Sequence, residues 1–143
     1  MTQFRIRLLL EQDAPVIAAL THELGYDIGP SFIQKQAHQI LGFPDHLAFV
    51  AEREGEILGY IHAIKAIRLT TPPFVEIVAL AVSEKARRLG IGKALVQKVE
   101  ETDLGTTSIR VRCNVIRESA HQFYESLGFV LKKEQKVFIK KRS

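Results

Sequence analysis

A nearly continuous apolar run, Phe74 to Val82, constrains the fold of this chain more than any other feature. Only Glu76 interrupts it, and such a run is typical of a central strand that is buried on both faces. A glycine-rich turn follows, and apolar residues then recur every four positions from Ile91 to Val99, as on one face of a helix. With a further strand expected from Ser108 to Cys113, this order predicts a parallel crossover unit.

The rest of the sequence predicts further strands and helices around this unit, in a mixed α/β order without an internal repeat. The Glu54-Gly55-Glu56 stretch is typical of a tight hairpin turn, and Gly25 and Gly128 are placed to end helices. The expected strands cover Phe4–Leu10, Leu47–Arg53, Ile57–Ile67, Phe74–Val82, Ser108–Cys113, Phe129–Lys133 and Lys136–Lys140, and the expected helices begin at Asp13, Ser31, Gly90 and Ser119. We therefore expect one mixed sheet of about seven strands, flanked by four helices.

The size and composition of the chain favour one globular domain over residues 1–143. A domain of this length buries roughly two thirds of its unfolded surface, which is enough for a core without disulfides or metal. The single cysteine, Cys113, cannot form an internal disulfide, and this favours a reducing compartment. The first residues lack the pattern of a secretory signal, and no apolar stretch reaches the roughly 18 residues of a membrane span. We expect a cytoplasmic protein that does not bind membranes.

The net charge of +4 arises largely near the end of the chain. The basic residues there are Lys132, Lys133, Lys136, Lys140, Lys141 and Arg142. A basic segment is also found in nucleic-acid-binding modules, which keeps such a module as an alternative. No aromatic platform or recognition helix is interleaved with these charges, so an edge strand protected by lysines explains them better. We expect no nucleic-acid partner and leave a homodimer open.

A turn rich in glycine and basic residues, Arg87 to Lys93, separates the apolar strand from its helix. Glycine lets backbone N–H groups approach an anion closely, and the helix N-terminus directs roughly half a positive charge toward it. The turn has neither the Gly-x-x-x-x-Gly-Lys-Ser/Thr motif nor the third glycine of a dinucleotide-binding fold, which leaves a different phosphate-bearing ligand. On composition alone, a simple packing turn explains Gly90-x-Gly92 equally well.

A second segment, taken together with this turn, resembles a known superfamily. Its residues are Asn114 and the run Ala120-His121-Gln122-Phe123-Tyr124-Glu125-Ser126-Leu127-Gly128-Phe129. With Arg87-x-x-Gly90-x-Gly92 they closely resemble the GCN5-related N-acetyltransferase (GNAT) superfamily, and the resemblance spans nearly the whole chain in element order. It implies a sheet that is splayed open between its fourth and fifth strands, here Phe74–Val82 and Ser108–Cys113, with the pantetheine arm of CoA in the gap.

The resemblance also implies which residues bind acetyl-CoA. The backbone of Leu80, Ala81 and Val82 would pair with the pantetheine amides. Asn114 would touch the same arm, and Tyr124 would face the thioester sulfur. The pyrophosphate would be held by Arg87, Arg88, Leu89, Gly90, Ile91, Gly92 and Lys93. In many relatives the asparagine lies closer to the helix alanine, at the position where this chain has Arg117.

Two side chains are candidates for proton transfer. A departing thiolate needs a proton, and the phenol of Tyr124, with an ordinary pKa of about 10, holds one at neutral pH. Without the resemblance, Tyr124 is explained better as part of a helix core stripe with Ala120, Phe123 and Leu127. Glu76 is the candidate for relaying a proton from the incoming ammonium through water, because a carboxylate in a buried strand often has a raised pKa. A structural Glu76 paired with a lysine or arginine explains the sequence equally well.

The sequence thus predicts an acetyl-CoA-dependent N-acetyltransferase that needs no metal. The amine of the acceptor, a small molecule or a peptide, would attack the thioester directly, while a backbone N–H near Leu80 to Val82 stabilises the oxyanion. His62 and His121 are proton carriers by type, but lone histidines are more often only hydrogen-bonded. A catalytically silent CoA-binding domain is the main alternative. The acceptor itself is not predicted, although Leu24–Asp45 and Ile67–Phe74 are the segments expected to contact it.

Overall fold

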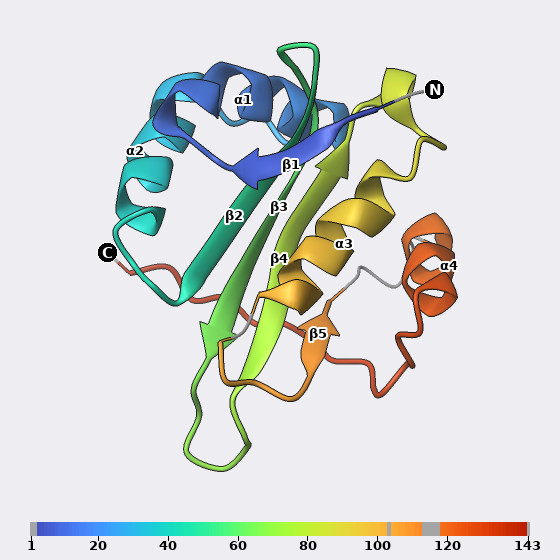
Figure 1. Ribbon diagram of the computed structural model, residues 1–143. Helices are drawn as coiled ribbons and strands as arrows, with labels where there is room; N and C mark the ends of the chain where they lie inside the picture. The colour runs from blue at the N-terminus through green and yellow to red at the C-terminus, as the bar shows by residue number, and fades with distance from the viewer. Residues whose placement is uncertain (1–2, 103, 113–117, 143) are drawn as a thin grey trace. The chain divides into compact units, whose positions relative to one another are not determined.

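The computed structural model describes residues 3–102, 104–112 and 118–142 (Figure 1). The chain forms two compact units, Met1–Val111 and Arg112–Ser143. The first unit contains the sheet and the helices α1 (Ala14–Glu23), α2 (Pro30–Ile40) and α3 (Ile91–Glu101), and the second contains α4 (Glu118–Ser126). The four expected helices are confirmed, and a single domain over the whole chain stays a prediction.

Five strands form one mixed sheet in the order β1-β2-β3-β4-β5. Their bounds are Arg5–Leu8, His46–Arg53, Glu56–Ala66, Phe74–Val82 and Ile109–Val111. The first three pairings are antiparallel, whereas β4 and β5 are parallel and are connected by the crossover that contains α3. The central strand Phe74–Val82, the crossover and the tight turn between β2 and β3 are confirmed.

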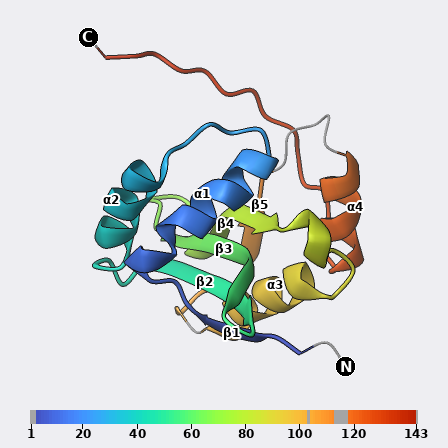
Figure 2. The ribbon, with the colours of Figure 1, turned by 90° about the horizontal axis from the view of Figure 1, so that it is seen from above.

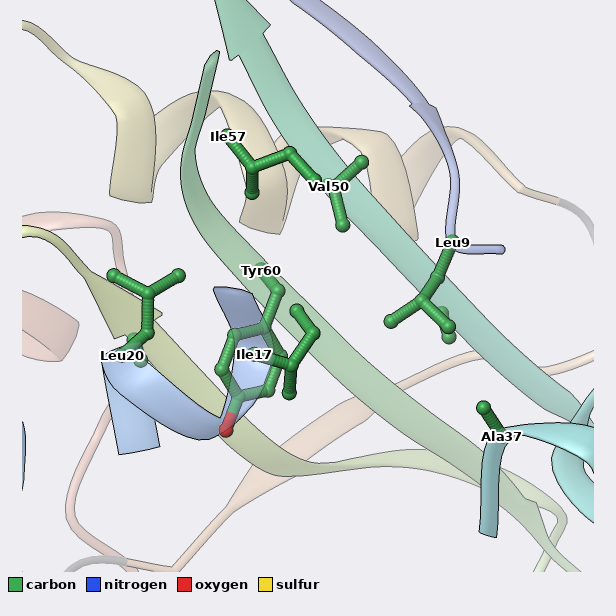
Figure 3. Packing of buried hydrophobic residues seen from close by; sticks show 9 residues of the cluster. Leu9, Ile17, Leu20, Ala37, Val50, Ile57 and Tyr60 are labelled. Carbon is green, nitrogen blue, oxygen red and sulfur yellow. The ribbon is translucent and has the colours of Figure 1, made fainter. Parts of the chain in front are cut away.

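Helices α1 and α2 cover one face of the sheet, and α3 covers the other (Figure 2). The core on the first face combines apolar side chains of both helices with those of the strands (Figure 3). It consists of Leu9, Ile17, Leu20, Ala37, Ala48, Val50, Ile57, Tyr60 and Ala81. The hydroxyl oxygens of Tyr60 and Thr21 are 2.9 Å apart, so this buried phenol is hydrogen-bonded.

On the opposite face, α3 packs closely because β3 carries a glycine at the contact. A Cβ added to Gly59 would lie 2.9 Å from the carbonyl oxygen of Ala81 and 3.1 Å from Cγ2 of Ile91. Ile91, Leu95 and Val99 are buried, which confirms the expected apolar face of this helix. The close contact fixes the start of α3 against the sheet near the end of β4.

The start of α1 is connected to β1 through the side chain of Asp13. Asp13 occupies the N-cap position, but its carboxylate makes no capping hydrogen bond. It accepts hydrogen bonds from both terminal nitrogens of Arg7, at 2.9 and 3.0 Å, and from the N–H of Leu10 at 2.8 Å. A bidentate guanidinium stabilises a buried carboxylate more than a single amide does, so the side chain turns toward β1.

Two of the seven expected strands are wrong. In the described part of the second unit, Phe129–Lys133 and Lys136–Lys140 have no strand pairing. Phe129 is half-buried, but the other large apolar side chains are exposed, at 87% for Val130 and 89% for Phe138. Apolar and basic residues in alternation suit a strand only where a neighbouring strand takes up the backbone hydrogen bonds, and none of the described strands does so. The sheet accordingly has five strands.

Other boundaries differ by a few residues. β1 ends at Leu8, short of Leu10, because the chain turns there toward the 3-10 helix Glu11–Asp13. α2 begins at Pro30, one residue before Ser31, and the fixed φ of proline suits the first helical turn. β5 ends at Val111, and Cys113 lies outside the described residues.

Candidate functional site

The predicted CoA-binding strand, β4, is paired differently along its length. Val75, Glu76 and Ile77 are register partners of Ile109, Arg110 and Val111 on β5. Beyond them, Val78–Val82 has β3 as its only strand partner among the described residues. We call Val75–Ile77 the paired half and Val78–Val82 the unpaired half. The outward N–H and C=O groups of the unpaired half form a strand edge to which an extended amide chain can add.

A β-bulge separates the two halves. His62 of β3 pairs with Ala79, and the next residue, Ala63, pairs with Ile77, so Val78 has no counterpart on β3. Bulges redirect a strand or end its pairing, and they are frequent next to active sites. Here the bulge coincides with the end of the β4–β5 ladder.

The three residues expected to pair with a pantetheine arm all lie in the unpaired half. Ala81 is buried and belongs to the core with α1 and α2, whereas Leu80 and Val82 are half-buried. Alternate side chains of a strand point to opposite faces, so these three hold the strand between the two helical layers. The predicted ligand contact uses only their backbone, which leaves the side chains available for packing.

The turn between β4 and α3 contains two residues with left-handed backbone. Gly90, the N-cap of α3, has φ 80° and ψ 14°, and Arg88 has φ 70°. This conformation suits glycine, but it costs a residue such as Arg88 roughly 1 kcal/mol or more. Left-handed residues in a loop curl successive N–H groups around a concavity that binds anions, which gives the strain a functional explanation.

The first turn of α3 provides hydrogen-bond donors. Its first intrahelical bond runs from the N–H of Ala94 to the carbonyl oxygen of Gly90, at 3.0 Å. The preceding N–H groups, those of Ile91, Gly92 and Lys93, consequently have no acceptor within the described part of the chain. Three unsatisfied donors at a helix N-terminus are a suitable site for an anion.

Exposed cations flank this helix end. The side chains of Arg87, Arg88 and Lys93 are exposed, while Leu89 is half-buried and Ile91 is buried, so the two apolar side chains anchor the turn. Cations beside unsatisfied N–H groups suit a polyanion such as a pyrophosphate. The structure thus brings together the whole predicted turn, between the unpaired half of β4 and α3.

Glu76 lies on the sheet face that α1 and α2 cover. Its register partners are Ile64 on β3 and Arg110 on β5, and Ile64 pairs in turn with His46 on β2. Register partners share a face, and His46 shares it with Ala48, which belongs to the core with α1 and α2. The carboxylate is half-buried. Proton transfer by Glu76 stays a prediction, as does the alternative of a structural ion pair.

Two histidines on the same face form a pair that the sequence did not indicate. Nδ1 of His46 is 2.9 Å from Nε2 of His62, and the two rings are stacked with centroids 5.2 Å apart. Burial, with a smaller contribution from the charge of His46, lowers the pKa of His62 to about 4. His62 is therefore neutral at pH 7. Only the register between β2 and β3 reveals the pair, because the two residues are far apart in the sequence.

In the second unit, the ring of Tyr124 contacts two aromatic neighbours. Its centroid is 5.0 Å from that of Phe123 and 5.5 Å from that of Phe129, and both contacts are edge-on. Tyr124 is half-buried, so both a packing role and a reactive hydroxyl are compatible with its surroundings. His121 is half-buried as well, and Asn114 lies outside the described residues.

Other features of the described surface do not extend this site. Two shallow hollows lie elsewhere, one between Arg7 and Glu56 and the other between Glu11 and Lys35. Among the side chains of residues 3–102, 104–112 and 119–142, no group of three or more from His, Cys, Asp or Glu is placed to hold a metal ion. No helix among these residues has the length and apolar character to cross a membrane.

Several known proteins are similar to this chain in sequence. A sequence model described as the acetyltransferase (GNAT) family matches residues 14–129. The chain is similar to a 5-NmdU N-acetyltransferase of Pseudomonas phage PaMx11, with 34% identity over 84 residues, which cover 57% of this chain and 56% of the relative. It is also similar to an N-alpha-acetyltransferase of Sulfurisphaera tokodaii, with 35% identity over 103 residues, which cover 62% of this chain and 58% of the relative. The chain spans little more than half the length of both relatives.

Solved structures agree in fold. The aminoglycoside N-acetyltransferase AAC(6')-Iy, in complex with CoA, superposes with a TM-score of 0.85 and 19% identity over 100% of this chain and 97% of that one. At this identity the likeness concerns the fold alone. The family match, in contrast, covers most of the chain and includes β4, the turn Arg87 to Lys93 and Tyr124. The chain therefore belongs to the acetyltransferase (GNAT) family, as its sequence motifs indicate.

Proposed function

We propose that this chain transfers an acetyl group from acetyl-CoA to a primary amine. The observation that carries the proposal is an anion-binding turn next to an unpaired strand edge. Arg87 to Lys93 offers charges and N–H groups to a pyrophosphate, and Val78–Val82 offers backbone to the amides of pantetheine. Acetyl-CoA carries both groups in one molecule. The family match and two relatives named for N-acetyl transfer support the same reaction.

In the proposed reaction, acetyl-CoA supplies an activated acetyl thioester. The ammonium of the acceptor loses a proton, which Glu76 accepts through water. The neutral amine then attacks the thioester carbonyl, and a backbone N–H of Leu80–Val82 stabilises the developing oxyanion. As the C–S bond breaks, Tyr124 donates its phenolic proton to the thiolate and later regains one from solvent. The acetyl group passes directly to the amine, so no covalent intermediate with the protein forms.

The test combines cofactor binding with turnover. Acetyl-CoA is titrated into the purified chain by calorimetry, and release of free thiol is followed with a panel of primary amines, with an amine-free reaction as the control for hydrolysis. We expect saturable acetyl-CoA binding and thiol release that depends on at least one amine. A chain that does not bind acetyl-CoA would contradict the proposal.

The same measurements separate the alternatives. Tight acetyl-CoA binding without thiol release from any amine would favour a catalytically silent CoA-binding domain. A salt-sensitive mobility shift with DNA or RNA, combined with no affinity for acetyl-CoA, would favour the basic nucleic-acid-binding module.

A further inference from the structure

Two arginines stack on one phenylalanine next to the paired half of β4. The guanidinium carbon of Arg110 is 3.9 Å from the centroid of the Phe74 ring, and that of Arg68 is 4.9 Å from it. Phe74 is buried, whereas both arginines are exposed. Two guanidinium carbons this close to one ring are less than about 9 Å apart. A single ring thus holds two positive charges close together.

Neither of these charges is neutralised by the described part of the protein. No carboxylate there lies within ion-pair distance of Arg68 or Arg110. A guanidinium is always charged, and when it stacks on a ring its N–H donors still point outward along its edge. Stacking also restricts the side chain, so less entropy is lost when the donors bind an oxyanion.

The two cations are close to the proposed proton acceptor. Arg110 and Glu76 are register partners, and Phe74 lies two residues before Glu76 on the same strand, so these side chains share one face of the sheet. Neighbouring strands are about 4.8 Å apart. A negative and a positive group are therefore presented side by side, which complements a ligand with an amine and an oxyanion a few bonds apart.

We propose, on the basis of the function proposed above, that the acceptor amine carries an oxyanion close to its amino group, and that Arg68 and Arg110 bind this oxyanion. A carboxylate and a phosphate share the required charge and acceptor oxygens. The amino group is then directed toward Glu76. Acetylation converts the amine to a neutral amide and releases the thiol of CoA, so the product keeps the oxyanion but loses the positive charge that attracts Glu76.

The competing explanation is that both arginines only cover the Phe74 ring. Packing and recognition differ in their effect on kinetics. Loss of a purely packing arginine lowers the melting temperature and affects all acceptors alike, whereas loss of a recognition arginine raises KM for anionic acceptors alone.

The kinetic test uses amines in matched pairs. Wild type, Arg110→Gln and Arg68→Gln are assayed with glycine and glycinamide, and with glucosamine 6-phosphate and glucosamine, so that the carboxylate and the phosphate are tested separately. In one of the two pairs, we expect each substitution to raise KM for the anionic amine by roughly 10- to 100-fold. KM for the neutral amine of the same pair should change by less than about twofold. Arg53→Gln removes the same charge elsewhere on the sheet, and it should change neither value.

A binding measurement keeps this inference separate from the reaction. Glycine and glucosamine 6-phosphate are titrated into wild type and Arg110→Gln in the presence of CoA. Binding to wild type that is lost in the variant supports the inference even if no amine is acetylated, an outcome that would count against the proposed function alone. Absence of binding to wild type, or equal KM changes for anionic and neutral members, would overturn the inference.

Discussion

The paired half of β4 presents side chains to a ligand, whereas the unpaired half presents backbone N–H and C=O groups. In the paired half, strands on both sides fix the backbone, and the side chains of Glu76 and Arg110 are held next to each other. In the unpaired half, the backbone of Val78–Val82 is held on one side by β3, and its other edge has no strand among the described residues. An unpaired edge within a fold is unfavourable unless something pairs with it. In the proposed site, one strand thus separates side-chain chemistry from backbone recognition, with the bulge at Val78 as the boundary.

Charge follows the same division. The turn that leads from the unpaired half into α3 carries Arg87, Arg88 and Lys93 with three unsatisfied N–H groups, so its charges are all positive. The paired half carries Glu76, and its register partner Arg110 on β5 adds a positive charge on the same face. The first arrangement suits a pure anion such as a pyrophosphate, and the second suits a ligand with both charges.

The largest expected effect concerns the leaving thiolate, whose thioester we assign to the unpaired half. Tyr124→Phe keeps the aromatic ring and its contacts with Phe123 and Phe129, and removes only the hydroxyl. If this hydroxyl protonates the thiolate, turnover falls by roughly 10²- to 10⁴-fold, while acetyl-CoA affinity and melting temperature change little. Thiol release at saturating amine measures the effect.

An acyl thioester with a more acidic leaving thiol is the control for this variant. A better leaving group needs less protonation, so it should restore part of the lost turnover. Wild-type turnover in Tyr124→Phe with acetyl-CoA itself would leave the tyrosine with a packing role only, and would remove a main reason for preferring an enzyme over a silent domain.

The next effect tests the turn at the start of α3. Gly92→Glu adds a carboxylate where we place the pyrophosphate, and we expect it to weaken acetyl-CoA binding by roughly 100-fold. The fold should not suffer, because an acidic side chain near a helix N-terminus is favourable in the absence of a bound anion. Gln97→Glu adds the same charge on an exposed position of α3 and is the matched control. Equal affinities of both variants by calorimetry would contradict the assignment of the turn.

A smaller effect tests the paired half. Glu76→Gln keeps the size of the side chain but removes its ability to accept a proton, and we expect turnover to fall roughly 10-fold or more at pH 7. At pH 9 the loss should be smaller, because more of the amine arrives already neutral. Glu100→Gln, at an exposed position of α3, should have no effect at either pH. An equal loss at both pH values in Glu76→Gln would indicate a structural role.

The parts of the site that depend on local sequence can be predicted well. β4 has the predicted bounds, Phe74–Val82, because a long apolar run has few ways to be buried other than as a central strand. The start of α3 is recognisable because Gly90 supplies the left-handed N-cap, and the apolar spacing after it fits only a helix. The turn between them carries the family motif, so the candidate anion site follows from sequence alone.

The parts that depend on pairing cannot be predicted in this way. The bulge at Val78 shifts the β3–β4 register by one residue, and no local pattern marks it. The β4–β5 register, which places Glu76 beside Arg110, also becomes visible only in the sheet. The contact between His46 and His62 depends on the β2–β3 register in the same manner. The strands expected after Phe129 are wrong for a related reason. Alternating apolar and basic residues indicate which side chains could share a face, but they do not show that a neighbouring strand is present.

A last effect, on stability and not on turnover, tests the boundary between the halves, where His62 pairs with Ala79 next to the bulge. Burial lowers the pKa of His62 to about 4 from an ordinary value of 6.5. As the pH falls from 6.5 toward 4, the unfolded chain takes up a proton at this ring and the folded chain does not, so the free energy of unfolding decreases. His62→Gln removes this uptake. Between pH 6.5 and pH 4.5, we therefore expect the free energy of unfolding of the variant to decrease by about 2 kcal/mol less than that of wild type. Because the ring is only partly buried, the difference between the two proteins should be somewhat smaller than this figure.

Urea unfolding across this pH range measures the difference, and His38→Gln provides a control of opposite sign. His38 is exposed, and its hydrogen bond to Glu11 raises its pKa. A raised pKa favours the folded chain as the pH falls, so removal of His38 should make the acid-induced loss slightly larger, whereas removal of His62 should make it smaller. If both variants followed the wild-type curve, His62 would take up its proton in the folded chain at an ordinary pH. The junction beside the bulge would then be open to water, and the two halves of β4 would be less sharply separated than their pairing indicates.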